Sequence, residues 1–228
     1  MKLTIAQIDI NDNQIEANTD KIIEIIETHK NSDIVLFPEL AITGFPENEN
    51  IEEKYQVGQK AFDRLCRETK DLPTTIMIGH IEKTGESFYN SAFLIAGGEA
   101  KVIHRKAHLW IDDQSVFEVG QQSSLFPMDS YQIGAQICFD LEFPEGSRAL
   151  TTAGADLILM PNGNMHPYAN THFILSQARA IENQVFIASC NRVGKGHGGH
   201  FTGESLVVSP IGDILLKMGP EEERIETI

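Results

Sequence analysis

The sequence predicts an α/β protein, and three features of the chain lead to this fold class. Short apolar runs rich in β-branched residues, such as residues 33–37, are typical of buried strands. They alternate with longer segments of helical periodicity, such as residues 18–29, in which isoleucines recur on one stripe. The length of 228 residues suits one sizeable domain, so we expect residues 1–228 to form a single domain.

The first part of the chain begins with a strand and then alternates helix and strand. The patterns predict, in chain order, a strand at residues 3–8, a helix at 18–29, a strand at 33–37, a helix at 51–69 and a strand at 74–80. Asn18 or Thr19 is a candidate N-cap for the first helix, because both side chains can accept a hydrogen bond from a free backbone N–H. Pro38 closes the second strand, so Glu39 stands at its end.

The second part opens with a predicted hairpin and a long loop. Gly97 and Gly98 separate two strand-like runs, as in a tight glycine turn. Residues 106–127 show weak periodicity and predict a loop of a length that is usually functional. The remaining predicted elements are strands at 88–96, 100–104 and 131–139, a helix from Pro144 to residue 153, a strand at 156–161, a helix at 172–182, strands at 185–190 and 205–209, and a last strand after a turn at 211–214.

One pattern occurs twice at the same register. DIVLFPE at residues 33–39 and DLILMPN at 156–162 each place four apolar residues between an acidic residue and a proline. This echo is compatible with two similar halves whose strand ends, at Glu39 and Asn162, face one site.

Composition excludes several classes of partner. The formal net charge of −15 argues against nucleic acid and anionic membrane surfaces, which need a basic face. No apolar run approaches the length that spans a bilayer, and the N-terminus lacks the pattern of a signal peptide. The three cysteines are neither a disulfide framework nor a metal-binding knuckle. We therefore expect a cytoplasmic protein with reduced thiols.

Cys138, Glu39 and Lys106 are candidate catalytic residues because each follows a predicted strand. Strand ends converge on the ligand crevice of an α/β sheet. Cys138 also precedes a predicted helix, whose positive end favours a thiolate. Taken singly, however, each residue has a plainer interpretation as a core thiol, a turn carboxylate or a solvent-facing amine, so the residues alone indicate only a possible cysteine enzyme.

The segments around these residues carry a resemblance. In chain order they are FPELAITG at 37–44, HRKAHL at 104–109, ICFDLEFPE at 137–145, QARAIENQ at 177–184, NRVG at 191–194 and GESLVVSPIG at 203–212. With these motifs the chain resembles the carbon–nitrogen hydrolase (nitrilase) superfamily. The motifs occur in the same order as in that family and extend over nearly the whole chain.

The resemblance implies a four-layer α-β-β-α sandwich and a Glu-Lys-Cys triad, which falls on Glu39, Lys106 and Cys138. It implies that Cys138 attacks the carbonyl of an amide while Glu39 moves the proton. Lys106, with the backbone N–H of Phe139, would stabilise the oxyanion. No metal ion and no organic cofactor is expected, and the expected partners are a small-molecule amide and a second copy of the chain in a homodimer.

Two positions depart from the family pattern. Members commonly carry a second glutamate in the loop after the lysine, and Asp113 stands there, one methylene shorter. We expect Asp113 to orient Lys106 or the substrate, with Asp112 and Glu118 as competing candidates. Members also usually continue beyond the equivalent of Ile228, so we expect a weakened dimer contact.

The residues after Cys138 favour the amidase and omega-amidase-like branch, because Phe139-Asp140 replaces the Trp-Glu of true nitrilases. An N-carbamoyl amidohydrolase, a nitrilase or a catalytically silent regulatory relative remain alternatives. Trp110 and Tyr89 are expected to pack in the structure. The residues expected to contact the substrate are Phe45, Phe139, Phe143, Asn162, Asn164 and Met165.

Overall fold

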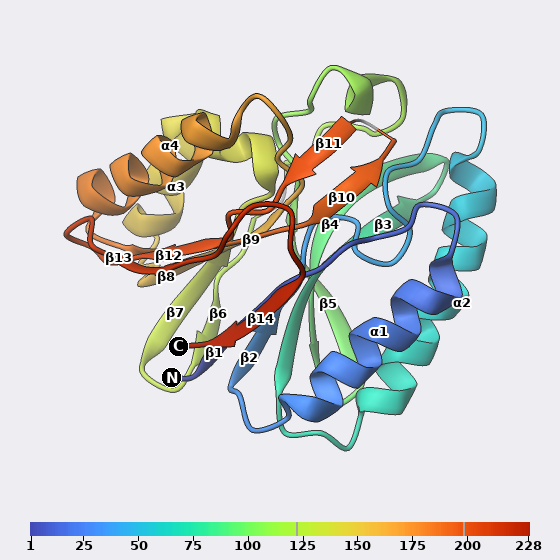
Figure 1. Ribbon diagram of the computed structural model, residues 1–228, viewed down its shortest axis with the longest axis horizontal. Helices are drawn as coiled ribbons and strands as arrows, with labels where there is room; N and C mark the ends of the chain where they lie inside the picture. The colour runs from blue at the N-terminus through green and yellow to red at the C-terminus, as the bar shows by residue number, and fades with distance from the viewer. Residues whose placement is uncertain (122, 198) are drawn as a thin grey trace.

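The computed structural model describes residues 1–121, 123–197 and 199–228, and it contains two six-stranded sheets. The strand orders are β14-β1-β2-β3-β4-β5 and β13-β12-β9-β8-β7-β6, and β10 and β11 form a separate hairpin (Figure 1). The first elements are β1 Leu3–Gln7, α1 Ile15–Thr28, β2 Ile34–Leu36, α2 Ile51–Thr69, β3 Thr75–Thr84, β4 Ser87–Ala96 and β5 Glu99–Arg105.

The remaining elements follow the loop that leaves β5. They are η1 Asp112–Ser115, β6 Phe126–Met128, β7 Tyr131–Ala135, η2 Cys138–Glu142, α3 Pro144–Thr152, β8 Leu157–Asn162, α4 Ala169–Asn183, β9 Phe186–Asn191, β10 Val193–Gly196, β11 Gly199–Thr202, β12 Leu206–Val208, β13 Ile214–Lys217 and β14 Arg224–Thr227.

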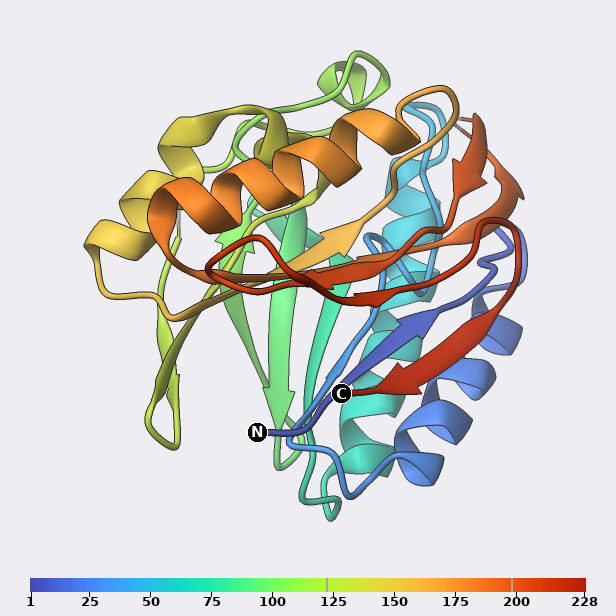
Figure 2. The ribbon, with the colours of Figure 1, turned by 60° about the vertical axis from the view of Figure 1, so that its left-hand side comes forward.

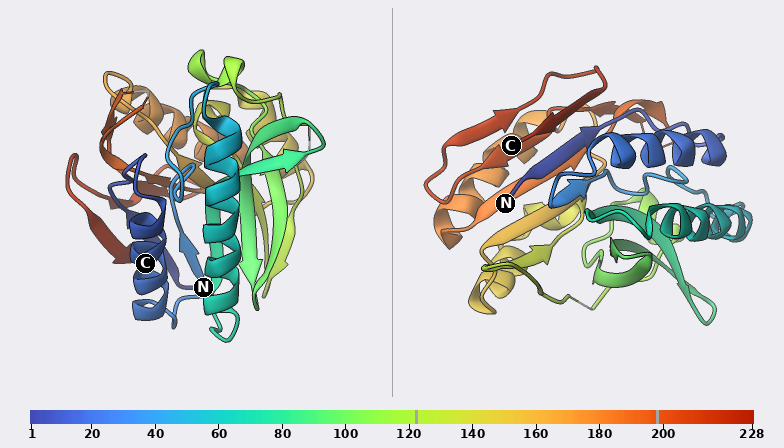
Figure 3. Two further views of the ribbon diagram at one scale, coloured as in Figure 1. Left: turned by 90° about the vertical axis from the view of Figure 1, so that its right-hand side faces the viewer. Right: turned by 90° about the horizontal axis from the view of Figure 1, so that it is seen from below.

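The two sheets pack face to face, with α1 and α2 outside the first and α3 and α4 outside the second (Figures 1 and 3). Strand alternation explains these layers, because successive side chains point to opposite faces. Leu3 and Ile5 of β1 lie in the core between the sheets, whereas Ala6 and Ile8 pack in the core beneath the outer helices. The predicted four-layer α-β-β-α sandwich is confirmed.

The sequence echo corresponds to the central strands of the two sheets. β2 lies between β1 and β3, all parallel, and β8 lies between β7 and β9, also all parallel. Their carboxyl ends meet: the backbone N–H of Glu39 donates to the carbonyl of Asn162 at 3.3 Å. Strand ends from both halves therefore converge at one point.

Several boundaries differ from the sequence prediction. α1 begins at Ile15, so Asn18 and Thr19 lie inside the helix and cap nothing. Asn18 instead donates to the carbonyl of Ile42, a tertiary contact that sequence cannot show. β7 ends at Ala135, and Cys138 opens a 3₁₀ turn instead of continuing the strand.

The hairpin prediction is confirmed, and other strands were not predicted. Gly97 and Gly98 both have positive φ, 58° and 79°, as a tight turn between β4 and β5 requires. The short β6 interrupts the predicted loop, and the β10–β11 hairpin and β14 were missed. β14 pairs antiparallel with β1, which brings the two ends of the chain side by side (Figure 2). Within the described ranges, every helix is too short or too polar to cross a bilayer.

Candidate active site

Four predicted residues from both halves of the sandwich line one cavity. Glu39 follows β2 and Lys106 follows β5, both from the first sheet, and Asp113 lies in η1 after Lys106. Cys138 follows β7 of the second sheet and reaches the same cavity. The fold thus brings together side chains that are up to about a hundred positions apart in sequence, as the convergence of strand ends predicts.

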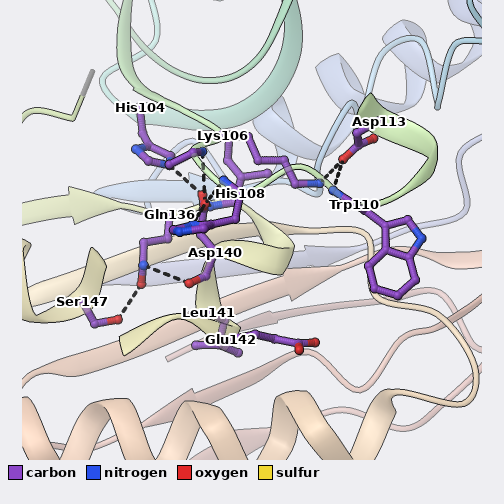
Figure 4. Close-up of polar contacts among 12 residues, drawn as sticks. His104, Lys106, His108, Trp110, Asp113, Gln136, Asp140, Leu141, Glu142 and Ser147 are labelled. Atoms are coloured by element: carbon purple, nitrogen blue, oxygen red, sulfur yellow. Dashed lines mark hydrogen bonds and ion pairs between the residues drawn. The ribbon is translucent and has the colours of Figure 1, made fainter. Parts of the chain in front are cut away.

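Lys106 lies between two buried carboxylates. Its Nζ is 2.7 Å from Oε1 of Glu39 and 2.5 Å from Oδ2 of Asp113. Asn90 Nδ2 also donates to Oε1 of Glu39, at 2.7 Å, and the backbone N–H of Trp110 donates to Asp113 at 3.3 Å. Each carboxylate is therefore fixed by a second donor as well as by the ammonium (Figure 4 shows the Lys106–Asp113 contact).

The second oxygen of Glu39 has no hydrogen-bond partner among the described residues. It lies against Gly163, where an added Cβ would come within 2.6 Å of it. The backbone N–H of Gly163 donates to the Cys138 sulfur. One glycine therefore contacts both the free carboxylate oxygen and the thiol, and any larger residue there would intrude between them.

Burial and the nearby carboxylate of Glu39 raise the pKa of the Cys138 thiol well above its ordinary value, although Lys106 opposes them. Burial also raises the pKa of Glu39, against the effect of Lys106. Burial alone would lower the pKa of Lys106, but the two carboxylates hold it well above its ordinary value. These effects favour the protonated thiol, so deprotonation of Cys138 calls for a base, the role that the resemblance implies for Glu39.

The backbone at Cys138 is strained. Its φ of 43° is a left-handed conformation that residues with a Cβ adopt only when neighbouring structure enforces it. This turn carries the thiol away from the direction of β7 and into the cavity.

Asp140 is the residue that holds this turn. Its buried carboxylate accepts from the backbone N–H of Ile137 at 3.0 Å, and from those of Ala107 and His108 at 3.1 and 2.9 Å. It also pairs with His104 Nε2 at 2.7 Å and His108 Nδ1 at 3.0 Å (Figure 4). These contacts join the cysteine turn to the segment that follows Lys106. Burial opposes the charge, but the two histidines and the backbone donors hold the pKa of Asp140 far below its usual value.

We expect Asp140→Asn to lower kcat by roughly tenfold to a hundredfold, because the turn at Cys138 would lose its fixed position relative to Lys106. The side-chain amide of the new asparagine would place its NH₂ group, itself a donor, opposite donors that now bind a carboxylate oxygen. We therefore also expect the free energy of unfolding to fall by about 2 kcal/mol. Steady-state kinetics and urea unfolding measure both effects. Asp129→Asn, in the turn between β6 and β7, is the matched control. Unchanged kcat in Asp140→Asn would contradict the positioning role.

The cavity is small, with a volume of about 40 Å³. Of the residues expected to contact substrate, Phe45, Phe139, Asn164 and Met165 line it, whereas Phe143 and Asn162 do not. Phe143 stacks on the ring of His108 at 3.8 Å. The amide of Asn162 lies behind the cavity wall, 3.2 Å from His172 and 3.0 Å from Ser189.

Several residues of the cavity wall were not predicted from the sequence. Trp110 was expected to pack, but it lines the cavity together with Tyr168, Phe201, His172 and Glu142. Tyr89 does pack, with the Arg105 guanidinium 4.3 Å from its ring centre. The position of Trp110 in the long loop after Lys106 was the one available signal.

One group of metal-ligating side chains exists among the described residues. His166, His200 and Glu221 place ligand atoms within 4.8 Å of one another. None of the three lines the cavity that holds Cys138. The expectation that catalysis uses no metal remains a prediction.

Comparison with known proteins decides the family. The sequence matches the family model described as "Carbon-nitrogen hydrolase" over residues 2–228. The chain belongs to the carbon–nitrogen hydrolase family. It is similar to an (R)-stereoselective amidase of Pseudomonas sp., with 32% identity covering 98% of this chain and 83% of the relative. It is likewise similar to the 2-oxoglutaramate amidase of Bacillus subtilis, with 32% identity covering 97% of this chain and 88% of that protein.

Solved structures agree with this carbon–nitrogen hydrolase assignment. The amidase of Nesterenkonia sp. superposes with a TM-score of 0.92 at 25% identity, covering 100% of this chain and 89% of that one. A glutamate-to-glutamine variant of the Nesterenkonia enzyme shows covalent addition of the acetamide moiety of fluoroacetamide at the active-site cysteine. The predicted family, fold and enzyme class, an amidase, are therefore confirmed.

Proposed function

We propose that this carbon–nitrogen hydrolase cleaves the C–N bond of small amides through a thioester on Cys138, releasing ammonia and a carboxylate. The observation that carries the proposal is the shared cavity. The cavity contains the thiol of Cys138, the carboxylate of Glu39 with one oxygen free of hydrogen bonds, and the ammonium of Lys106 held by two carboxylates. The amidases among the relatives support the amide as the bond that is cleaved.

In the first half of the reaction, the Cys138 sulfur attacks the amide carbonyl and its proton passes to the free oxygen of Glu39. Negative charge develops on the carbonyl oxygen. Lys106 and the backbone N–H of Phe139, near the start of η2, are the donors proposed to stabilise it. Glu39 then gives the proton to the nitrogen, the C–N bond breaks, and ammonia leaves behind a thioester.

In the second half, Glu39 takes a proton from water, which attacks the thioester carbonyl. The C–S bond breaks, the proton returns to sulfur, and the carboxylate product leaves. Asp113 accepts a hydrogen bond from Lys106 and none from Cys138, so its proposed role is to hold the ammonium in place.

An ammonia-release screen tests the proposal and its alternatives. We expect the purified chain to release ammonia from butanamide and related small amides, and intact mass spectrometry to detect an acyl adduct that maps to Cys138. Ammonia released only from nitriles would favour a nitrilase, and cleavage only of N-carbamoyl compounds a carbamoyl hydrolase. Failure on all three classes would favour the silent relative and overturn the proposal.

We expect kcat/KM to fall at acidic pH with a midpoint above the ordinary pKa of glutamate, because burial raises the pKa of Glu39. The reaction needs Glu39 without its proton, so activity is present above the raised pKa and lost as pH falls through it. The charge of Asp113 also raises this pKa, so Asp113→Asn should move the midpoint to lower pH.

The pH profile of kcat/KM with butanamide measures this midpoint, and Glu118→Gln, in the same loop, is the matched control. A midpoint in Asp113→Asn that stays in place, or rises, would contradict the assignment of the acidic limb to Glu39.

The homodimer is a further proposal. The outer face of α4 exposes Ile174 and Ile181, and the neighbouring turn and strand expose Ile211 and Leu215. Ile181 lies against the turn at Gly212, which places the outer face of α4 next to the turn that carries Ile211. We expect light scattering to give twice the chain mass of 25.3 kDa, and Ile181→Asp to give the monomer. A monomeric wild type would contradict this proposal.

A further inference from the structure

We propose that the substrate is a cationic amide, whose positive charge is recognised at the cavity mouth by Asp112, Glu142 and the rings of Trp110, Phe139 and Tyr168. The proposal rests on the proposed amide hydrolysis, and it names the chemical class of substrate that this site prefers. It depends on the side chains that line the cavity beyond the residues assigned to the reaction.

The lining carries excess negative charge. Beyond Glu39 and Asp113 it contains the carboxylates of Asp112 and Glu142, which come from the loop after β5 and from η2. Within the described ranges, Lys106 is the one lysine or arginine in the lining, and two carboxylates already hold it. The two positions outside those ranges, 122 and 198, are Gln and Gly and add no charge.

The neighbouring cations are engaged elsewhere. Arg192 is fully buried, pairs with Asp12 at 3.1 Å and lies 4.1 Å from the ring centre of Phe201, outside the lining. Lys54 donates to the carbonyl of Phe45 at 2.8 Å. The Arg192 guanidinium and the Lys54 ammonium therefore form no ion pair with the carboxylates that line the cavity.

The two histidines of the lining each face a carboxylate of their own. His197 lies 3.0 Å from Glu47, which is outside the lining. His172 Nε2 lies 3.7 Å from Oε1 of Glu142, longer than a hydrogen bond, and its other ring nitrogen is 3.2 Å from the Asn162 amide. Arg179 donates to the backbone carbonyl of Glu142 at 3.1 Å and pairs with Glu182 at 3.0 Å. Among the described residues, the Glu142 carboxylate forms no ion pair with a lysine or arginine, and its side chain remains 29% exposed.

Aromatic rings line the same cavity as these carboxylates. Trp110 makes edge contacts with Phe139 at 5.1 Å and Tyr168 at 5.4 Å between ring centres. In Figure 4 the side chain of Glu142 extends away from the Asp140 contacts, towards the side of the view on which the indole lies. The faces of aromatic rings attract cations, and tryptophan does so most strongly. Rings and carboxylates together form a site for an ammonium group.

The same arrangement disfavours an anionic amide. A substrate such as 2-oxoglutaramate, for which the B. subtilis relative is named, would bring a carboxylate toward Glu142 and Asp112 without a free cation to receive it. Like charges brought together out of water repel strongly. The net charge of −15 acts in the same direction, since it draws cations to the surface and repels anions.

The test compares amides that match in size and differ in charge. We pair butanamide with 3-aminopropanamide, and pentanamide with 4-aminobutanamide, and add malonamate as the anion, all at pH 7. We expect kcat/KM for the cationic member of at least one pair to exceed that of its neutral match by about tenfold, corresponding to about 1.4 kcal/mol. We expect malonamate to be the poorest substrate, and the preference to shrink at high salt.

Variants assign the preference to the cavity mouth. In Glu142→Gln, and more fully in the double variant with Asp112→Asn, the ratio of cationic to neutral kcat/KM should fall toward one. Glu145→Gln, an exposed residue in α3 outside the lining, is the matched control and should keep the wild-type ratio. A ratio at or below one in the wild type, or an unchanged ratio in the double variant, overturns the proposal.

A binding measurement supports the kinetics without turnover. Trp110 is the sole tryptophan, so its fluorescence reports ligands at the cavity directly. In Cys138→Ala we expect 3-aminopropanamide to bind more tightly than butanamide, and equal affinities would count against the inference. If the wild type hydrolyses no amide, the proposed function fails. If it hydrolyses neutral amides as well as cationic ones, only this inference fails.

Discussion

Cys138→Ala is expected to abolish ammonia release from small amides, with a loss of at least about 10⁴-fold in kcat. The sulfur is the atom that forms the thioester in the proposed mechanism. Without it, water would have to attack an unactivated amide directly. Lys106 and Glu39 remain in the variant, so substrate binding should persist while turnover is lost. Ammonia assays and intact mass spectrometry, which should show no acyl adduct, measure the effect.

The control for this variant is Cys66→Ala. Cys66 is a half-buried thiol of α2 outside the cavity, and burial raises its pKa to about 11. We expect this variant to retain wild-type kcat. Ammonia release that survives in Cys138→Ala at more than about a hundredth of the wild-type rate would reject the covalent mechanism.

Lys106→Met is expected to damage both the reaction and the fold. Loss of one oxyanion donor lowers rates by about 10²–10³-fold. The variant also leaves Glu39 and Asp113 buried without the ammonium between them, and breaking a buried ion pair costs about 3–5 kcal/mol. We therefore expect a large drop in the midpoint of urea unfolding at neutral pH.

The stability of Lys106→Met should also change with pH in a defined direction. Without Lys106, the pKa of Glu39 should lie further above its value in the unfolded chain, because burial disfavours the charged carboxylate and the ammonium that opposes this effect is gone. The variant should then be most stable at low pH, where Glu39 is neutral, and lose stability as pH rises through this raised pKa. Lys101→Met, at an exposed position of β5, is the control. Equal losses at pH 5 and pH 8 would show that the carboxylates are not the cause.

The convergence of the three candidate catalytic residues on one cavity could be predicted from sequence better than the rest of the cavity wall could. Glu39, Lys106 and Cys138 lie in local motifs at strand ends, and parallel strands bring such ends together. The central strands could be predicted because their side chains are apolar on both faces. β14 escaped prediction because it is a short edge strand with charged side chains, and its partner β1 lies at the far end of the chain.

Features that depend on long-range contacts could not be predicted. Burial and Glu39 raise the pKa of Cys138, whereas the local sequence pointed only to a helix start, which favours a thiolate. The role of Asp140 depends on such contacts too, because its carboxylate is bound by His104, His108 and backbone N–H groups. Trp110 reaches the cavity from a loop and Glu142 from the 3₁₀ turn η2, and the local sequence holds no periodic signal for either.

The hydrogen bond from Glu39 to the carbonyl of Asn162 joins the two sheets at the site itself. Glu39 and Lys106 follow strands of one sheet and Cys138 follows a strand of the other, so their relative positions depend on how the two sheets pack. We therefore expect the catalytic rate to depend on packing between the sheets. A core residue such as Met77, which lies between the sheets and outside the cavity lining, should affect the rate of the proposed reaction through the relative placement of the two halves.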